Sequence, residues 1–329
     1  MSWRISILDK SPVAEHDTAT DALARTLSLA KEADALGYHR FWIAEHHNTP
    51  HLASPSPELL IAWILGQTSR IRVGSGGVML QHYSPYKVAE NFNVLAAIAP
   101  GRVDLGVGKA PGGLPLATRA LQQGLHQEAK GNFAEQLAQL DRWLHAADEE
   151  LRATPQPSTP AQGFLLGASE ESALLAARLN WNFVFAAHLN GDTDLLRDVA
   201  TAWRANSARD LIVAVQAIVA PVQAQAEALA QKVEVWGVEL VNGQRVSVAS
   251  EEQAYAFARQ AGSEPLRIAR RAQSLLAGTP ELVTAQLEAL HQRWGIDEFI
   301  IDTPVAEGNL RSQSLRLLAG ARQPREVTA

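Results

Sequence analysis

The chain has 329 residues, no cysteine, and 29 basic against 35 acidic residues, for a formal net charge of −6. A hydrophobic share of 47% excludes an intrinsically disordered or fibrous protein. The lack of cysteine excludes disulfides, thiolate metal sites and cysteine nucleophiles. Scattered basic residues on an acidic chain argue against a nucleic-acid partner. Residues 1–5 lead directly into a strand-like run, so we expect no signal peptide, no membrane span and a cytoplasmic location.

Strand-like and helix-like patterns alternate along the chain, one unit roughly every 30 residues, as in parallel sheets. Apolar runs predict strands at residues 3–8, 38–44, 71–78, 102–107, 164–167, 182–187, 211–220 and 298–302. Helical periodicity and capping residues predict helices at residues 21–36, 58–67, 85–98, 133–144, 169–179, 195–205, 280–294 and 310–319. Eight such units over residues 1–329 favour a single (β/α)8 TIM-barrel domain over an open doubly wound sheet.

Residues 221–278 interrupt this alternation, because the segment is too long for a connection. It contains two helix-like stretches around an Asn242-Gly243 turn. We interpret it as an insertion between the seventh strand and its helix. In a barrel, an insertion on that side can form a lid over the active site.

Barrel enzymes carry their active sites at the C-terminal ends of the strands, which selects candidate residues before any motif is considered. The candidates are Asp9, Ser11, Glu45-His46-His47, Ser75-Gly76-Gly77, Gly108-Lys109, Gly167 to Ser172, His188, Asn190 and Asp302.

An acid and two imidazoles at one strand end, Glu45-His46-His47, suit proton transfer or hydrogen bonding to a polar ligand. A structural histidine pair is the alternative. A metal site that also uses His82 and His188 is a third interpretation. It is weakened because adjacent strand residues point to opposite sides, so both histidines rarely bind one ion.

The glycine-rich run Gly74-Ser75-Gly76-Gly77 lies inside a predicted strand, where glycine is normally unfavourable. Close approach of a flat cofactor and a simple β-bulge are equally good explanations. The run is not a dinucleotide fingerprint, because the strand continues after it instead of opening a helix.

Two further segments suit an anion. Lys109 follows a strand and can neutralise one phosphate, although Ala110 stands where a nucleotide triphosphatase needs Ser or Thr. The run from Gly167 to Ser172 offers hydroxyls and backbone N–H groups at a helix N-terminus. The alternative there is a simple N-cap formed by Ser169.

Three motifs in order, each at a predicted strand end, carry a resemblance to a known family. They are Ala44-Glu45-His46-His47-Asn48, the run from Arg72 to Leu80, and the run from Pro100 to Gly108. With them the chain resembles the bacterial luciferase-like flavin-dependent monooxygenases over nearly its whole length.

The resemblance implies a (β/α)8 barrel that uses reduced FMN as a co-substrate, together with O2, to oxygenate a small organic substrate. It implies that Glu45 and His46 flank the flavin ring, with His46 as the proton-transfer residue. It also implies a non-proline cis bond between Gly76 and Gly77 beneath the flavin. The remaining implied cofactor-binding residues are Ser75, Lys109, Gly167, Ser169 and Ser172. Lys109 replaces a common Arg, which loses a bidentate phosphate contact.

The family also implies a homodimer, and the helix at residues 58–67 is apolar nearly all round, which suits a subunit interface. Coverage of that helix by the chain's own loops is the alternative. Because the chain lacks a nicotinamide fingerprint, a separate flavin reductase is an expected partner.

Two other functions stay open on the sequence. One is a metal-dependent barrel hydrolase that uses the histidine cluster. The other is a flavin-binding protein without turnover. The sequence does not identify the organic substrate, because the loops that shape its pocket are the least transferable part of the fold.

Overall fold

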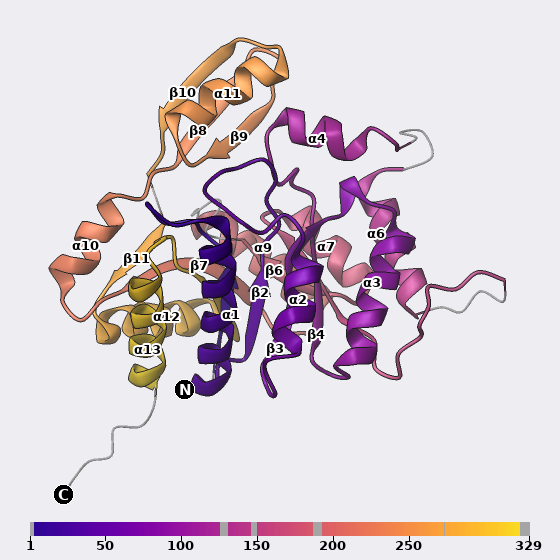
Figure 1. Ribbon diagram of the computed structural model, residues 1–329, viewed down its shortest axis with the longest axis horizontal. Coiled ribbons are helices and arrows are strands. Elements are labelled where there is room, and N and C mark those ends of the chain that lie inside the picture. The colour runs from indigo at the N-terminus through magenta and orange to yellow at the C-terminus, as the bar shows by residue number, and fades with distance from the viewer. Residues whose placement is uncertain (1–2, 126–130, 146–149, 187–192, 273, 323–329) are drawn as a thin grey trace, which may run out of the picture.

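The computed structural model describes residues 3–125, 131–145, 150–186, 193–272 and 274–322. Eight parallel strands close into a barrel, and helices cover its outside (Figure 1). In order around the barrel the strands are β1 (Arg4–Asp9), β2 (Arg40–Ile43), β3 (Arg72–Met79), β4 (Val103–Gly108), β5 (Gln162–Gly167), β6 (Asn182–Phe185), β7 (Ile212–Val219) and β12 (Glu298–Asp302). The predicted (β/α)8 TIM barrel is confirmed.

Each strand is followed by at least one helix before the next barrel strand begins. These helices are α1 (Ala19–Leu36), α2 (Pro57–Leu65), α3 (Pro85–Ile98), α4 (Pro115–Gln122), α6 (Phe133–His145), α7 (Glu170–Arg178), α9 (Thr193–Asn206), α12 (Pro280–Trp294) and α13 (Gly308–Arg322), with a 3-10 turn η1 (Leu80–His82) before α3. None of the described helices is both long and apolar enough to span a membrane.

Most predicted boundaries lie within a few residues of the observed ones, and the differences have local causes. Helix α1 starts earlier than expected because Thr18 and Asp21 form a capping box, each side chain accepting from the other's backbone N–H. Helix α4 was not expected from the sequence. It begins with Pro115 at its first position.

The segment between β7 and α12 is the predicted insertion, and it contains more strand than expected. Its elements are α10 (Gln223–Gln231), β8 (Trp236–Leu240), β9 (Arg245–Val248), α11 (Glu251–Ala261), β10 (Pro265–Arg270) and β11 (Leu275–Gly278). The Asn242-Gly243 turn joins β8 to β9 in a three-stranded antiparallel sheet with β10, while β11 pairs with β7. The sheet and α11 lie beside α4 at one end of the barrel (Figure 1), where Gln260 accepts hydrogen bonds from Leu116 N and Arg119.

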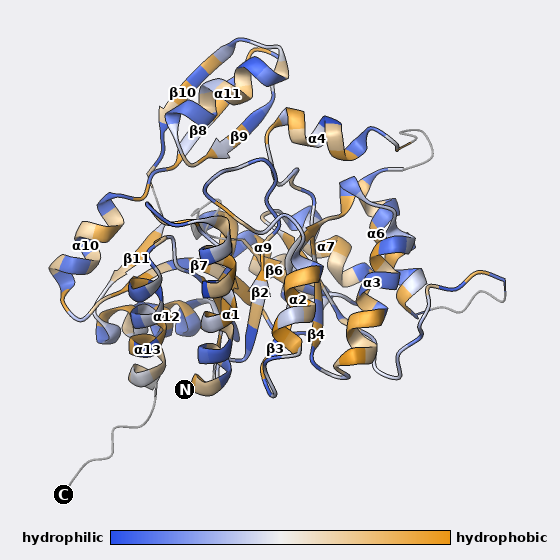
Figure 2. Ribbon diagram, viewed as in Figure 1, coloured by the Kyte–Doolittle hydropathy of each residue, from blue (hydrophilic) through white to orange (hydrophobic). Residues whose placement is uncertain are grey.

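Side-chain alternation along the strands divides the hydrophobic core into two layers, and Figure 2 shows hydrophobic colour along the strands and on the helices that cover them. Residues such as Ile7, Phe41 and Phe299 face outward and pack against the helices. A separate cluster fills the middle of the barrel and consists of Leu8, Trp42, Ala44, Phe164, Val184, Ile212, Ala214 and Ile300. The interior is therefore a packed core and not a pore.

Below this apolar layer, at the N-terminal ends of the strands, the barrel encloses a charged network centred on Arg40. The Arg40 guanidinium binds Asp104 Oδ2 (2.8 Å) and both oxygens of Glu298 (2.6 and 3.0 Å). Arg72 and the Trp42 indole also donate to Asp104. Burial raises the pKa of Asp104, but the charges of Arg40 and Arg72 outweigh it and hold that pKa below its usual value.

We expect Arg40→Met to lower the free energy of unfolding by about 3–5 kcal/mol, because it leaves buried carboxylates without their cation. Urea unfolding followed by circular dichroism measures this. Arg197→Met is the matched control, since Arg197 pairs with Asp194 and Asp198 on the exposed side of α9 and its loss should scarcely move the midpoint. Equal midpoints for the two variants would show that the network does not stabilise the barrel.

Candidate active site

Glu45 lies two residues beyond β2 and points out of the barrel, since its neighbour Ala44 belongs to the interior cluster. Its carboxylate is 1% exposed and has donors on both oxygens. Oε1 accepts from His47 Nε2 (2.7 Å) and the Tyr83 hydroxyl (2.8 Å), and Oε2 accepts from Met79 N (3.0 Å). The carboxylate thus ties the ends of β2 and β3 together.

Two ionisable groups near Glu45 are shifted by this environment. Burial, reinforced by the Glu45 charge, raises the pKa of the Tyr83 phenol, so it stays a neutral donor at physiological pH. Burial also raises the pKa of Glu58, at the start of α2, with a smaller contribution from Glu45. Burial and the Glu45 charge therefore both favour the neutral forms of Tyr83 and Glu58.

His46 occupies the opposite side of the same strand end. By alternation from Trp42 and Ala44, which face the interior, His46 continues the inward row. Its backbone N–H donates to Ser54 O (3.1 Å), and its side chain is half-buried. Of the two residues predicted to be catalytic, His46 is thus placed toward the barrel mouth and Glu45 behind the wall of the barrel. Their catalytic roles stay predictions.

The Gly76–Gly77 peptide bond is cis, as the resemblance implied. The ladder between β3 and β4 is irregular between Ser75 and Val78, so the predicted bulge is also present. A Cβ on Gly76 would lie 2.6 Å from Leu8 Cδ1, and one on Gly77 would lie 2.8 Å from Gly106 O. Glycine is required at both positions because neighbouring strands leave no room for a side chain.

Ser75 is fully buried, and its hydroxyl bridges to β4. It donates to Gly106 O (2.8 Å) and accepts from Gly106 N (3.1 Å). These bonds connect the strands where the ladder is interrupted. Its predicted contact with a cofactor stays a prediction, and the structure gives the hydroxyl a structural role.

Lys109 and the start of α7 lie side by side, because they follow the neighbouring strands β4 and β5. Gly108, the last residue of β4, pairs with Leu166, which places Lys109 beside Gly167, the last residue of β5. Lys109 is exposed. A Cβ on Gly167 would lie 2.6 Å from Ser172 Cβ, so glycine lets the helix approach the strand closely. One cation and one helix N-terminus therefore meet at this edge of the barrel mouth.

Ser169 is the N-cap of α7, as the simpler interpretation predicted, and its Oγ accepts from Ser172 N (3.2 Å). Its Oγ also lies 3.0 Å from Ser172 Oγ, and either hydroxyl can be the donor in that pair. Capping uses the oxygen of Ser169 as an acceptor, and one of the two O–H groups remains for an anion. The capping and anion-binding interpretations are therefore compatible.

The histidines of the alternative metal site have other partners. His47 binds Glu45, and His82 is buried with Nε2 donating to Pro111 O (2.8 Å) and Nδ1 accepting from Gln122 (3.1 Å). His188 lies outside the described residues. Within the described ranges, no three His, Asp or Glu side chains are arranged to hold a metal ion.

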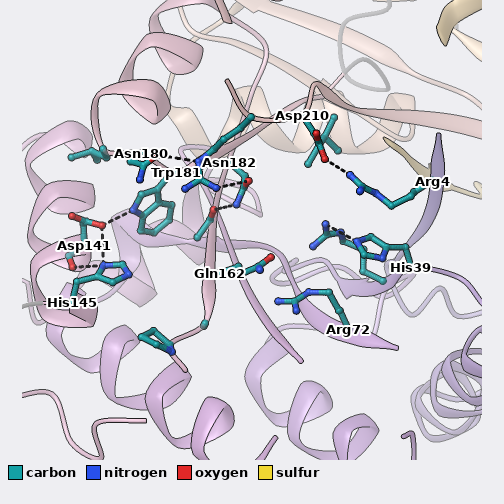
Figure 3. Close-up of a pocket in the computed structure, with 17 residues that line it drawn as sticks. Arg4, His39, Arg72, Asp141, His145, Gln162, Asn180, Trp181, Asn182 and Asp210 are labelled. Atoms are coloured by element: carbon teal, nitrogen blue, oxygen red, sulfur yellow. Dashed lines mark hydrogen bonds and ion pairs between the residues drawn. The ribbon is translucent and has the colours of Figure 1, made fainter. Parts of the chain in front are cut away.

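A hollow of about 720 Å³ opens at the opposite, N-terminal end of the barrel (Figure 3). Arg4, Arg40, Arg72 and Gln162, each the first residue of a barrel strand, lie along it. Burial, then the Arg40 charge, lowers the pKa of His39 on its wall to about 4, so this imidazole is neutral at physiological pH. Polar residues at this face of a TIM barrel contribute to stability, and we do not assign the active site there.

The sequence motifs do not include three polar residues of the barrel mouth. Lys10 and Gln216 were not singled out, and Asp302 was named only as a strand end. Alternation from the apolar interior positions of β1, β7 and β12 would have identified all three as inward-facing polar residues.

Comparison with known proteins agrees with this arrangement. Residues 1–298 match the family model described as luciferase-like monooxygenase. N-acetyl-S-alkylcysteine monooxygenase of Bacillus subtilis (strain 168) is 40% identical over 328 residues, covering 97% of this chain and 98% of that protein. Among solved structures, apo-MsnO8 has a TM-score of 0.78 at 29% identity, covering 97% of both chains. The oxygenating constituent of 3,6-diketocamphane monooxygenase from Pseudomonas putida, in complex with FMN, has a TM-score of 0.69 at 20% identity, again covering 97% of both chains.

The fold and the site together define the class of protein: a (β/α)8 barrel whose polar cluster lies at the C-terminal ends of the strands. The chain belongs to the luciferase-like monooxygenase family, and the family makes it an oxidoreductase.

We expect Tyr83→Phe to destabilise the protein by about 1.5–3 kcal/mol, because the buried Glu45 carboxylate loses a hydrogen-bond donor. Urea unfolding measures the difference. Tyr86→Phe is the control, since that hydroxyl donates to Arg152 O at the surface. A cost no larger than that of the control would argue against a structural role for the Tyr83–Glu45 bond.

Proposed function

We propose that this chain is an FMN-dependent monooxygenase that uses reduced FMN and O2 to oxygenate a small organic substrate. The observation that carries the proposal is the meeting of Lys109 with the N-terminus of α7 at the mouth of a luciferase-like barrel. A cation, two serine hydroxyls and a helix N-terminus are the donor set that a phosphate monoester requires.

The residues present fit FMN. Lys109, Ser169 and Ser172 would hold its phosphate, with Gly167 allowing the close approach of α7. The glycines at positions 76 and 77 let β3 pack closely against its neighbours in the barrel wall. When bound, reduced flavin supplies the two electrons needed to transfer one oxygen atom of O2 to a substrate while the other becomes water.

The protein's own contribution would be orientation, exclusion of water and control of protons. His46 faces the mouth and is the candidate for proton transfer at its imidazole. Glu45 would act behind it by holding Tyr83, His47 and Met79 N, which fixes the loop that carries both histidines.

The relatives support this function and suggest a first substrate. The 40%-identical Bacillus subtilis protein is an N-acetyl-S-alkylcysteine monooxygenase. A solved structure of this fold contains FMN, and another, a secondary alcohol dehydrogenase, contains an F420–acetone adduct. We therefore propose FMN as the cofactor, with F420 as the compound to compare.

Turnover tests the proposal directly. The purified chain is given reduced FMN, O2 and a panel of thioethers that includes N-acetyl-S-alkylcysteines, and oxygen uptake and products are measured. We expect uptake coupled to an oxygenated product. Binding of FMN without product would favour a flavin-binding protein without turnover, and an essential stoichiometric divalent ion would favour the metal-dependent hydrolase.

We expect Lys109→Ala to weaken FMN binding roughly 10- to 100-fold, the loss of a hydrogen bond to a charged group. Fluorescence titration measures the dissociation constant. Lys109→Arg should preserve or strengthen binding, since its fork matches a phosphate, and F420 serves as the comparison ligand. Unchanged affinity in Lys109→Ala would remove Lys109 from the phosphate site.

A homodimer through α2 and α3 is also proposed. Leu59 and Trp63 of α2 and Val94 and Ile98 of α3 are exposed, on two helices that contact each other and lie in front of the barrel in Figure 2. An exposed apolar patch of this kind is typical of a subunit interface. A separate flavin reductase as electron donor and a cytoplasmic location remain predictions.

A further inference from the structure

Three inward-facing polar residues form the top layer of the barrel interior. Leu8, Ala214 and Ile300 lie in the apolar interior cluster. Lys10, Gln216 and Asp302 lie two residues after Leu8, Ala214 and Ile300, respectively. Since side chains alternate along a strand, all three point into the barrel just beneath its C-terminal mouth.

The three side chains are connected to one another. Asp302 is 1% exposed, and its Oδ2 accepts from Lys10 Nζ (2.6 Å) and Gln216 Nε2 (3.0 Å). A buried carboxylate requires such partners. Gln216 lies directly opposite Asp302 in the β7–β12 ladder, so the position of the carboxylate is fixed by the backbone.

The Lys10 side chain is partly exposed, in contrast to that of Asp302. Its side chain is 24% exposed, while that of Asp302 is 2% exposed. An ammonium carries three N–H donors. Among the described residues its only partner is Asp302, so it can bind a further anion without breaking the ion pair.

Lys10 is also structurally coupled to His46. Ser54 accepts from His46 N through its carbonyl oxygen and donates to Lys10 O through its hydroxyl, both at 3.1 Å. Strands β1 and β2 are neighbours, and Ala44 N donates to Asp9 O. The candidate proton-transfer residue and the lysine are therefore held by one buried serine.

In the circular order of strands, Lys10 lies across the barrel from Lys109. The proposed phosphate contacts follow β4 and β5, whereas Lys10 follows β1 and Asp302 ends β12. In the circular order β1 is three strands from β4, and β12 is three strands from β5. A second cation on the far side of the mouth is too distant in the fold to serve the same phosphate. The position of Lys10 therefore indicates a binding site for a separate anionic group.

We propose that Lys10 binds the carboxylate of an anionic organic substrate, with Asp302 and Gln216 holding its ammonium in place. This inference rests on the proposed function and adds a substrate class to it, namely small carboxylates that carry the oxygenated group elsewhere in the molecule. N-acylated S-alkyl amino acids have this chemistry. Lys10 is then the residue that determines specificity.

The test compares a charged probe with a neutral one. N-acetyl-S-methylcysteine and its primary carboxamide are assayed with wild type and Lys10→Met under the turnover conditions above. We expect Lys10→Met to raise KM for the carboxylate at least roughly tenfold, the value of a charge-assisted hydrogen bond, and to change KM for the amide less than about threefold. Lys31→Met on the exposed side of α1 is the control and should change neither.

A structural ion pair would give a different result. If Lys10 only neutralises Asp302, Lys10→Met would alter both probes equally or lower stability alone, and the inference would be overturned. Because Lys10→Met leaves Asp302 buried without its cation, the double variant Lys10→Met/Asp302→Leu is the companion that removes both charges. It should fold and still lose the preference for the carboxylate.

Direct binding separates this inference from the proposed function. Isothermal titration calorimetry measures both probes on the same variants without turnover. Carboxylate binding that depends on Lys10 in a protein that oxygenates nothing would support the inference and refute the function. Oxygenation of the carboxylate that is unchanged in Lys10→Met would support the function and refute the inference. If wild type does not bind the carboxylate more tightly than the amide, the inference is overturned.

Discussion

The need to neutralise charge inside a closed barrel governs much of this structure. Arg40 binds Asp104 and Glu298, which come from β4 and β12 on either side of it in the circular order. Burying these groups is costly unless every one is paired. The network therefore holds the two halves of the barrel in one register and leaves the N-terminal end polar and structural.

The same alternation that creates this network builds the opposite end. On β1, β2 and β12 the inward row has a polar residue at the bottom and an apolar residue in the middle, and on β1, β7 and β12 a polar residue follows at the top. The difference between the ends is access. Arg40 is 4% exposed and surrounded by its partners, whereas the Lys10 side chain is partly exposed.

After β2, the alternation of side chains places the adjacent residues Glu45 and His46 on opposite sides of the barrel wall. His46 faces the mouth, and Glu45 faces the layer between barrel and helices, where Tyr83 and Met79 N hold its carboxylate. After β5, Ser169 caps α7 and also lies beside the hydroxyl of Ser172. At the first place the supporting carboxylate stands next to the residue that would contact ligand, and at the second the capping serine is itself a proposed phosphate contact.

Local signals in the sequence determined the barrel and much of its mouth. Periodicity located α3 and β12 to the residue. The motifs around Glu45 and Lys109 follow strand ends as predicted, and Gly76 lies inside β3. The antiparallel sheet in the insertion was missed because its pairing is between β8, β9 and β10, and short segments reveal such pairing poorly. Only the tertiary structure could pair Glu45 with Tyr83 and Met79 N, bury the Ser75 hydroxyl against β4, and bring Lys10, Gln216 and Asp302 together. These relations depend on which strands become neighbours when the barrel closes.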